Sequence, residues 1–237
     1  MVTPRTGSGA VRRAVGGDVR LTVCPDYRDD YLGQQVSKLH ADEFTDADLI
    51  CHVDSDVVFT RPVSPADLLD AGLPWIVRRA VSLLGRHRPW LAPTEEFLGR
   101  PVAYDFMQQP PFTYPRWLYP EVRALSLARH GIPLDRYVAG RPPRGFSEFN
   151  VLGAHAYAAH RAEFAWYDAD AHTDTYPDTG TDAARVPRLC RWYWSRGGID
   201  AALRRELEEI TGGYARAATP DHSLRHSGRS GLDDPCH

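Results

Sequence analysis

The feature that most constrains this chain is the acidic tripeptide Asp54-Ser55-Asp56, which directly follows the apolar run at residues 49–53. A run of Leu, Ile, Cys and Val without strict alternation predicts a central strand that is buried on both faces. The carboxyl end of such a strand delivers Asp54 and Asp56 to a crevice or to water. Side chains at i and i+2 share one face of a strand, about 6–7 Å apart.

Two carboxylates held this close repel each other unless a cation lies between them. Hard oxygen ligands suit Mg²⁺ or Mn²⁺, which keep coordination positions open for water and substrate phosphates. A D-x-D in a turn more commonly caps a helix or solvates a loop. The preceding strand, the second apolar stretch at residues 57–59 and the following Arg61-Pro62 favour the metal interpretation. We therefore predict that Asp54 and Asp56 bind a divalent cation.

This order of strand, D-x-D, apolar run and Arg-Pro resembles the nucleotide-sugar-dependent glycosyltransferases of the GT-A fold. Two further stretches are similar to a bacterial branch of GT-A-like proteins: Gln34-Gln35-x-x-Lys38-Leu39 before the strand, and Ser147-Glu148-Phe149-Asn150. The resemblance covers about residues 18–211. It implies an α/β fold with a GT-A-like, Rossmann-like mixed sheet flanked by helices. It also implies a nucleotide-sugar donor, an unknown acceptor, and a cation, Mn²⁺ or Mg²⁺, that bridges the donor diphosphate.

The resemblance also suggests roles for residues in these two stretches. Gln34, Gln35 and Lys38 would bind a phosphate or a sugar hydroxyl, although polar residues on the outer face of an amphipathic helix need no function. Glu148 would be the catalytic base that takes the acceptor proton, and Asn150 would hydrogen-bond a substrate. The structural alternative is that Ser147 caps a helix with Glu148 in its first turn, where the helix dipole favours negative charge.

A third stretch, around Arg191 and Arg196, precedes the last predicted helix. Backbone N–H groups at a glycine-rich helix N-terminus can bind an anion, and arginines add fixed charge. We predict substrate binding by Arg191, Ser195, Arg196 and Gly197; a packed aromatic strand with surface arginines is the alternative. His155 and His160 fall in a predicted helix and are interpreted as packed or exposed residues rather than ligands.

Composition limits the classes of function. With 237 residues and 43% hydrophobic content, the chain is long enough for one α/β domain and too short for two. A net charge of −3 provides no basic field for nucleic acid. The apolar stretches are too short to cross a bilayer, and the N-terminus lacks a signal-peptide core, so we expect no transmembrane segment and a cytoplasmic location. The four cysteines are scattered, which predicts reduced thiols.

The chain divides into a predicted disordered segment at 1–17, a GT-A-like domain at 18–211 and a flexible tail at 212–237. We predict strands at 19–24, 49–53 and 73–77. Helices are predicted at 31–44, 121–130, much of 147–164 and 200–211, the last ending at Gly212-Gly213. The segment 85–119 is rich in proline and aromatic residues. Its rings could form an acceptor platform, but a satellite core under a long loop is the favoured interpretation.

Two alternatives to a glycosyltransferase remain open. Only 53 residues precede Asp54, so the nucleotide pocket that the N-terminal βαβ unit builds in GT-A domains is predicted to be truncated, rebuilt from elsewhere or absent. The first alternative is a phosphohydrolase of the haloacid dehalogenase type, with Asp54 as nucleophile and Asp56 as general acid/base. Against it, the only lysine, Lys38, precedes the motif rather than following it. The second is a GT-A-like sugar-nucleotide or glycan-binding protein without turnover.

Overall fold

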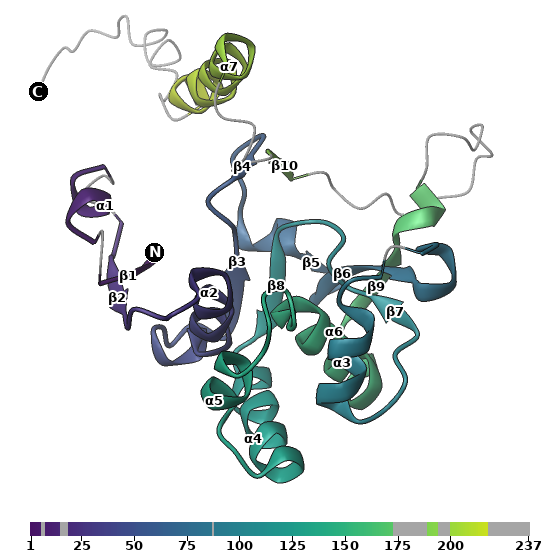
Figure 1. Cartoon of the computed structure of the whole chain (residues 1–237). Coiled ribbons are helices and arrows are strands. Elements are labelled where there is room, and N and C mark those ends of the chain that lie inside the picture. Colours follow the sequence, from purple (N-terminus) through teal and green to yellow (C-terminus); the bar gives the residue numbers. More distant parts are fainter. Residues whose placement is uncertain (6–7, 15–18, 87, 173–188, 194–199, 218–237) are drawn as a thin grey trace, which may run out of the picture.

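The chain folds as a mixture of helices and short strands (Figure 1). The computed structural model describes residues 1–5, 8–14, 19–86, 88–172, 189–193 and 200–217. The α-helices are α1 Ser8–Ala14, α2 Asp30–Leu39, α3 Leu91–Leu98, α4 Leu118–His130, α5 Leu134–Ala139, α6 Glu148–Ala159 and α7 Ala201–Ala217. The strands are β1 Val2–Pro4, β2 Thr22–Cys24, β3 Leu49–His52, β4 Val57–Phe59, β5 Leu69–Asp70, β6 Leu73–Ala80, β7 Tyr104–Asp105, β8 Phe112–Pro115, β9 Ala165–Asp168 and β10 Cys190–Trp192.

The described strands form four small sheets. The largest has the order β5-β6-β7, with antiparallel pairs, and β9 adds to β6 in parallel. β3 pairs antiparallel with β8, β4 pairs antiparallel with β10, and β1 pairs parallel with β2. β8 lies beside β6, so the β3–β8 pair and the largest sheet are neighbours (Figure 1). The mixed α/β class is therefore confirmed.

The prediction that residues 49–53 form a central strand buried on both faces is wrong. β3 belongs to a two-stranded sheet, and its side chains alternate: Ile50 and His52 are buried, whereas Cys51 is exposed. Successive side chains of a strand point to opposite faces, and the helical layer covers only one face of β3. The strand still delivers its carboxyl end to the turn that holds Asp54.

Helices α2 to α6 enclose the main core against β3, β8 and one face of β6. The two faces of β6 serve different clusters, because Ile76 packs into the main core while Trp75 and Val77 pack with Leu189 on the other side. Most rings of segment 85–119 are buried, but in the main core rather than in a satellite core. These rings are Phe97, Phe106, Phe112, Tyr114 and Tyr119.

Several predicted helices are confirmed with shifted ends. α2 buries Leu32, Val36 and Leu39 as the spacing predicted, but it stops at Leu39 and a short 3₁₀ turn follows. α4 begins three residues earlier than predicted and ends before Gly131, whose φ of 68° suits a residue without a side chain. α7 continues through Gly212-Gly213 to Ala217, so the glycine pair does not end this helix.

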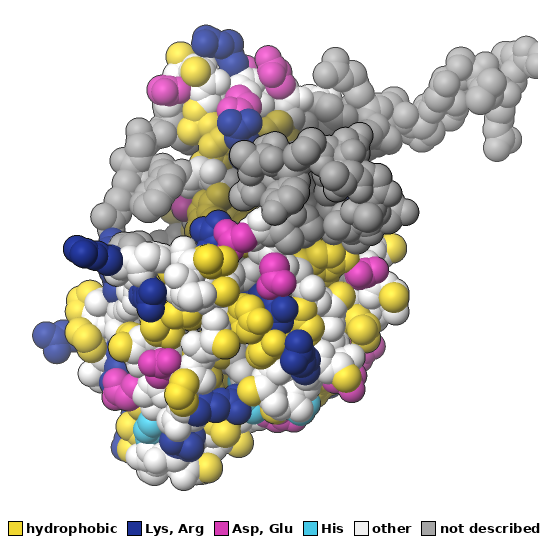
Figure 2. All heavy atoms as spheres, turned by 90° about the vertical axis from the view of Figure 1, so that its right-hand side faces the viewer, with side chains coloured by type: hydrophobic (Ala, Val, Ile, Leu, Met, Phe, Trp, Pro, Cys, Tyr) yellow, Lys and Arg dark blue, Asp and Glu magenta, His cyan; other side chains and the backbone are white. Residues whose placement is uncertain are grey.

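The N-terminal segment 1–17, predicted to be disordered, contains β1 and α1, and β1 pairs with β2. The division of the chain at residues 17 and 211 stays a prediction. Among the described residues, no helix combines the length and apolar character that crossing a bilayer requires. On the face seen in Figure 2, basic and acidic side chains are interspersed with apolar ones rather than gathered into a patch of one sign.

We expect Gly153→Ala to destabilise the protein by about 1–3 kcal/mol, because overpacking a tight contact forces the neighbours apart. A Cβ at Gly153 would lie 2.6 Å from the Cβ of Phe106, in the main core. Gly212→Ala is the matched control, since a Cβ there meets nothing within 4 Å inside helix α7. Denaturant unfolding should show a loss for the first variant and a neutral or slightly favourable effect for the second. Equal stability of the two variants would contradict this packing analysis.

Candidate functional site

The candidate site centres on the ammonium group of Lys38, in the last turn of α2. Its Nζ lies 2.6 Å from Asp54 Oδ1 and 2.7 Å from Glu148 Oε1. It also lies 4.7 Å from the centre of the Phe149 ring. Burial disfavours the ammonium form, but the charges of Glu148 and Asp54 outweigh that cost and raise the pKa of Lys38. Lys38 therefore stays charged between two carboxylates.

The face of α2 that was expected to be its outer surface is partly covered. Lys38 turns toward α6, and Gln35 is buried. In the amide orientation that satisfies its neighbours, the Gln35 side-chain nitrogen donates to the carbonyl oxygen of Phe146 at 3.0 Å and to Glu148 Oε2 at 3.3 Å. Gln34 is exposed and lines a cavity together with Lys38.

Glu148 is the first residue of α6, behind Lys38. The hydroxyl of Ser147 caps this helix by accepting from the Asn150 backbone N–H at 3.4 Å, as the structural alternative predicted. The Glu148 side chain is only 4% exposed, and one oxygen meets Lys38 while the other meets Gln35. Glu148 does not line the cavity beside Lys38. The structure thus brings Glu148 next to Asp54, but as a buried partner of Lys38.

The two acids of the D-x-D have different partners. Asp54 follows β3 and holds Lys38, whereas Asp56 Oδ1 accepts from Trp192 Nε1 at 3.1 Å in the turn that leads to β4. Both residues are partly exposed. An ionised carboxylate has two oxygens and about four acceptor positions, so neither bond uses up the side chain. Carboxylate oxygens suit a hard divalent cation, but Asp54 lines the cavity beside Lys38 whereas Asp56 does not, and an ion at Asp54 would compete with Lys38.

Asn150 is a buried structural residue rather than part of an open site. Its Oδ1 accepts from the Phe106 backbone N–H at 2.7 Å, and its Nδ2 donates to Ser147 Oγ at 3.2 Å and Asp105 Oδ2 at 3.3 Å. These bonds join the start of α6 to the end of β7. The expected contact of Asn150 with a substrate does not fit this geometry, because the amide is already engaged on both sides.

Arg191 lies on β10, which pairs with β4 directly after the D-x-D turn. Its guanidinium is well exposed and forms an ion pair with Glu206 of α7 at 2.5 Å. The other residues predicted for this loop, Ser195, Arg196 and Gly197, lie outside the described residues. Arg191 is near the D-x-D in the fold, but its charge is directed to α7 rather than to Asp54.

A cavity of about 770 Å³ opens beside Lys38 and Asp54. One wall is formed by α2 and the end of β3, including Gln34, Ser37 and Val53. The opposite wall is formed by the N-terminal segment, including Met1, Thr3 and Val11, and by the neighbouring Arg20 and Thr22. Ligand pockets in proteins have volumes of about 300–1,000 Å³. The N-terminal segment that was expected to be disordered thus supplies part of this cavity.

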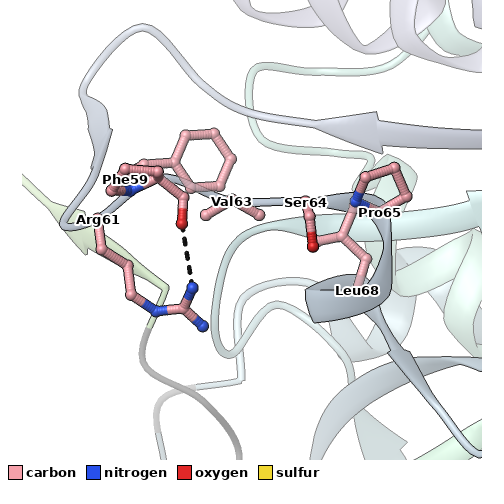
Figure 3. A pocket seen from close by; sticks show the side chains of 7 residues that line it. Phe59, Arg61, Val63, Ser64, Pro65 and Leu68 are labelled. Atoms are coloured by element: carbon pink, nitrogen blue, oxygen red, sulfur yellow. Dashed lines mark hydrogen bonds between the residues drawn. The ribbon is translucent and has the colours of Figure 1, made fainter. Parts of the chain in front are cut away.

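A second cavity, of about 440 Å³, lies beyond the D-x-D turn (Figure 3). It is lined mainly by apolar side chains of β4 and the following loop, among them Phe59, Val63 and Leu68. Its one charged residue, Arg61, donates to the Pro62 carbonyl oxygen at 3.0 Å and pairs with Asp67 at 2.6 Å. This cavity offers little to bind or transform a charged ligand.

Sequence reasoning missed His52, the last residue of β3, which lies two positions before Asp54. Its ring is buried beside Phe149, and its Nε2 lies 2.6 Å from the hydroxyl oxygen of Tyr119. Burial and the nearby charge of Lys38 lower the pKa of His52 to about 3. The signal was available in the sequence, since a histidine at an inward position of an apolar strand must be buried, and a buried histidine is neutral.

We expect His52 to make the protein acid-sensitive. The folded pKa lies below the ordinary value of 6.5, so the unfolded chain binds more protons between pH 6.5 and pH 3, and stability falls with pH across this window. Between pH 7 and pH 5 the loss should be about 2 kcal/mol. Urea unfolding of the wild type and of His52→Gln, which keeps a polar group near Tyr119, measures this term. Parallel stability profiles in the two proteins would show that His52 is not the cause.

Comparison with known proteins gives no relative. No protein-family model matches the chain, and no significantly similar curated protein or solved structure is found.

Proposed function

We propose that this protein transfers a sugar from a nucleotide-sugar to an acceptor, with its donor site at the cavity beside Lys38. The observation that carries the proposal is the convergence of three separated motifs on one ammonium group. Lys38, Asp54 and Glu148 come from a helix, a strand end and a second helix, and the last two are almost a hundred residues apart. The same three motifs carry the resemblance to GT-A-like proteins, and this supports the proposal.

Lys38 is the residue best suited to meet the donor. An ammonium group is a compact charge with three donors, and Asp54 and Glu148 accept from it here. Lys38 lines the cavity, so a donor phosphate could take a hydrogen bond from it. Electrostatic stabilisation of a departing diphosphate is worth most in a partly dry site.

A divalent cation would be held by Asp54 and Asp56. When bound, it would neutralise the negative charge that develops on the nucleoside diphosphate leaving group. Asp54 would then serve two cations, because it also holds Lys38. Replacement of Asp56 by Asn should weaken Mn²⁺ binding and leave the ion pair of Lys38 intact.

Glu148 is better placed to position Lys38 than to act as the acceptor base. Its two oxygens contact Lys38 and Gln35, and it is buried away from the cavity. A base must lie within hydrogen-bond reach of the acceptor proton. In this role, Glu148 holds the ammonium group of Lys38 beside the cavity, and the capped first turn of α6 fixes the position of Glu148.

The phosphohydrolase alternative is favoured by one observation, the contact between Lys38 and Asp54. A cation beside a nucleophilic carboxylate would stabilise the charge of an aspartyl phosphate and of the phosphoryl group in flight. Here the lysine precedes the motif in sequence yet reaches Asp54 in space. The position of Lys38 before the motif in the sequence is therefore only a weak argument against a phosphohydrolase.

The first functional prediction is that nucleotide-sugars bind with Mn²⁺ and are turned over. A panel of nucleoside-diphosphate sugars should include one that raises the melting temperature only with Mn²⁺ and releases nucleoside diphosphate. Lys38→Met should raise the KM for the donor at least tenfold, while Arg136→Met, which removes an exposed cation of α5, should change nothing. If no donor raises the melting temperature or releases nucleoside diphosphate, the protein is not a glycosyltransferase, and the interpretation without turnover is favoured.

The same assay separates the two roles of Glu148. If Glu148 were the base, Glu148→Gln should lower kcat by about 10²–10⁴-fold and remove the acidic limb of the pH profile. If Glu148 only positions Lys38, the Glu148→Gln substitution should instead raise the KM for the donor and leave the shape of the pH profile unchanged. Melting curves of the variant exclude simple unfolding as the cause.

A separate test addresses the phosphohydrolase. Beryllium fluoride with Mg²⁺ forms a stable adduct on a nucleophilic aspartate, so a phosphohydrolase should show such an adduct on Asp54 and should cleave phosphate esters. We expect neither. An adduct that is present in the wild type and lost in Asp54→Asn would replace the transferase proposal with the hydrolase.

A further inference from the structure

A cluster of two histidines and one glutamate lies at the other end of α6 from Glu148. His155 belongs to α6, His160 follows the end of this helix, and Glu121 belongs to the first turn of α4. Glu121 Oε2 lies 3.1 Å from His155 Nε2 and 2.7 Å from His160 Nε2. Glu148 and His155 are seven positions apart on the helix, which is about 10 Å along its axis. The cluster is therefore separate from the site around Lys38.

The donor atoms of this cluster already face one point. All three atoms lie within 4.8 Å of one another, and among the described residues this is the one group of three or more such side chains that does so. In a tetrahedral site with bonds of about 2.0–2.1 Å, the donor atoms lie about 3.4 Å apart. The observed separations of Glu121 from the two histidines would have to open by less than an ångström to admit an ion.

The chemistry of the three donors selects the kind of ion. Two imidazole nitrogens and one carboxylate form a ligand set that suits first-row transition metals and, in particular, Zn²⁺ with a water in the fourth position. Mg²⁺ and Ca²⁺ prefer oxygen ligands alone. A neutral imidazole that binds through Nε2 carries its proton on Nδ1, so ion binding replaces the two N–H···O contacts with metal bonds.

The surroundings hold the three side chains in place. α4 and α6 pack against each other in the main core, through fully buried residues such as Val122 and Ala156. The Trp117 ring meets the His160 ring edge to face, with 4.6 Å between the centres. His155 is mostly buried, while His160 and Glu121 remain accessible from solvent. A site carried on two packed helices is more rigid than one built on loops, and this one has a route for the ion to enter.

We propose that Glu121, His155 and His160 bind Zn²⁺ and thereby tie α4 to the end of α6. The alternative is a carboxylate that merely accepts hydrogen bonds from two histidines. Such hydrogen bonds would satisfy all three side chains. They would not, however, explain why the Nε2 atoms of His155 and His160, five positions apart, both lie next to the same carboxylate oxygen.

The test is Zn²⁺ binding by the full chain after removal of metal with a chelator. Calorimetry should find a Zn²⁺ ion that Mg²⁺ does not displace, and Glu121→Gln and His160→Gln should each weaken its binding at least tenfold. Cobalt(II) bound at the same site should show the visible absorption of a tetrahedral centre, and the two variants should lose it. His155→Asn extends the series if its melting curve shows that this buried position tolerates the change.

Two matched controls guard against other ligands. His40→Gln removes a histidine that also contacts two carboxylates, Glu43 and Asp135, but through opposite ring nitrogens that cannot share one ion. The tail contains His222, His226 and His237, and replacement of all three by Gln tests whether these histidines bind the metal. Neither control should change the affinity of this site. Absence of Zn²⁺ binding by the wild type would overturn the proposal. Zn²⁺ binding that survives Glu121→Gln and His160→Gln, or that is lost with the tail histidines, would also overturn it.

Discussion

One buried ammonium group between two carboxylates organises the centre of this protein. Lys38 connects α2 to the end of β3 through Asp54 and to the start of α6 through Glu148. Glu148 is buried and would be costly to leave alone, because removing one partner of a buried ion pair typically costs about 3–5 kcal/mol, whereas Asp54 is partly exposed. The packing of α2 against α6 is therefore tied to the charge balance at this point. A neutral side chain at position 38 would leave the buried Glu148 with the Gln35 amide as its remaining side-chain partner.

The aromatic core around Lys38 determines which neighbouring groups carry charge. The Phe149 ring stacks on Phe112, with 3.9 Å between the centres, and lies beneath the ammonium group. His52 lies against the same Phe149 ring and stays neutral, because an imidazolium there would be both buried and close to Lys38. His52 is thus uncharged, and the positive charge beside Asp54 belongs to Lys38 alone among these groups.

Local rules predicted local structure well. The i, i+4, i+7 stripe located α2, and the serine cap located the start of α6. They failed where distant partners decide the outcome. The exposed face of β3 depends on its pairing with β8, sixty residues away, and α7 runs through Gly212-Gly213 although local propensity favours a stop. Lys38 was assigned to an outer helix face because spacing cannot reveal that α6 covers it. The motifs could be found in the sequence, but their convergence on one ammonium group could not.

The identity of the central cation is itself informative. The chain has 28 lysine and arginine residues, and Lys38 is the only lysine. Elsewhere arginine serves well, as in the fork that Arg123 makes with Asp42. A guanidinium is a wide planar group, whereas an ammonium is a compact point charge, and here it touches two carboxylates and the face of a ring at once. A compact cation at position 38 therefore suits a point where Asp54, Glu148 and the Phe149 ring meet. The same compactness leaves room in the cavity for a ligand oxygen to approach the third ammonium proton.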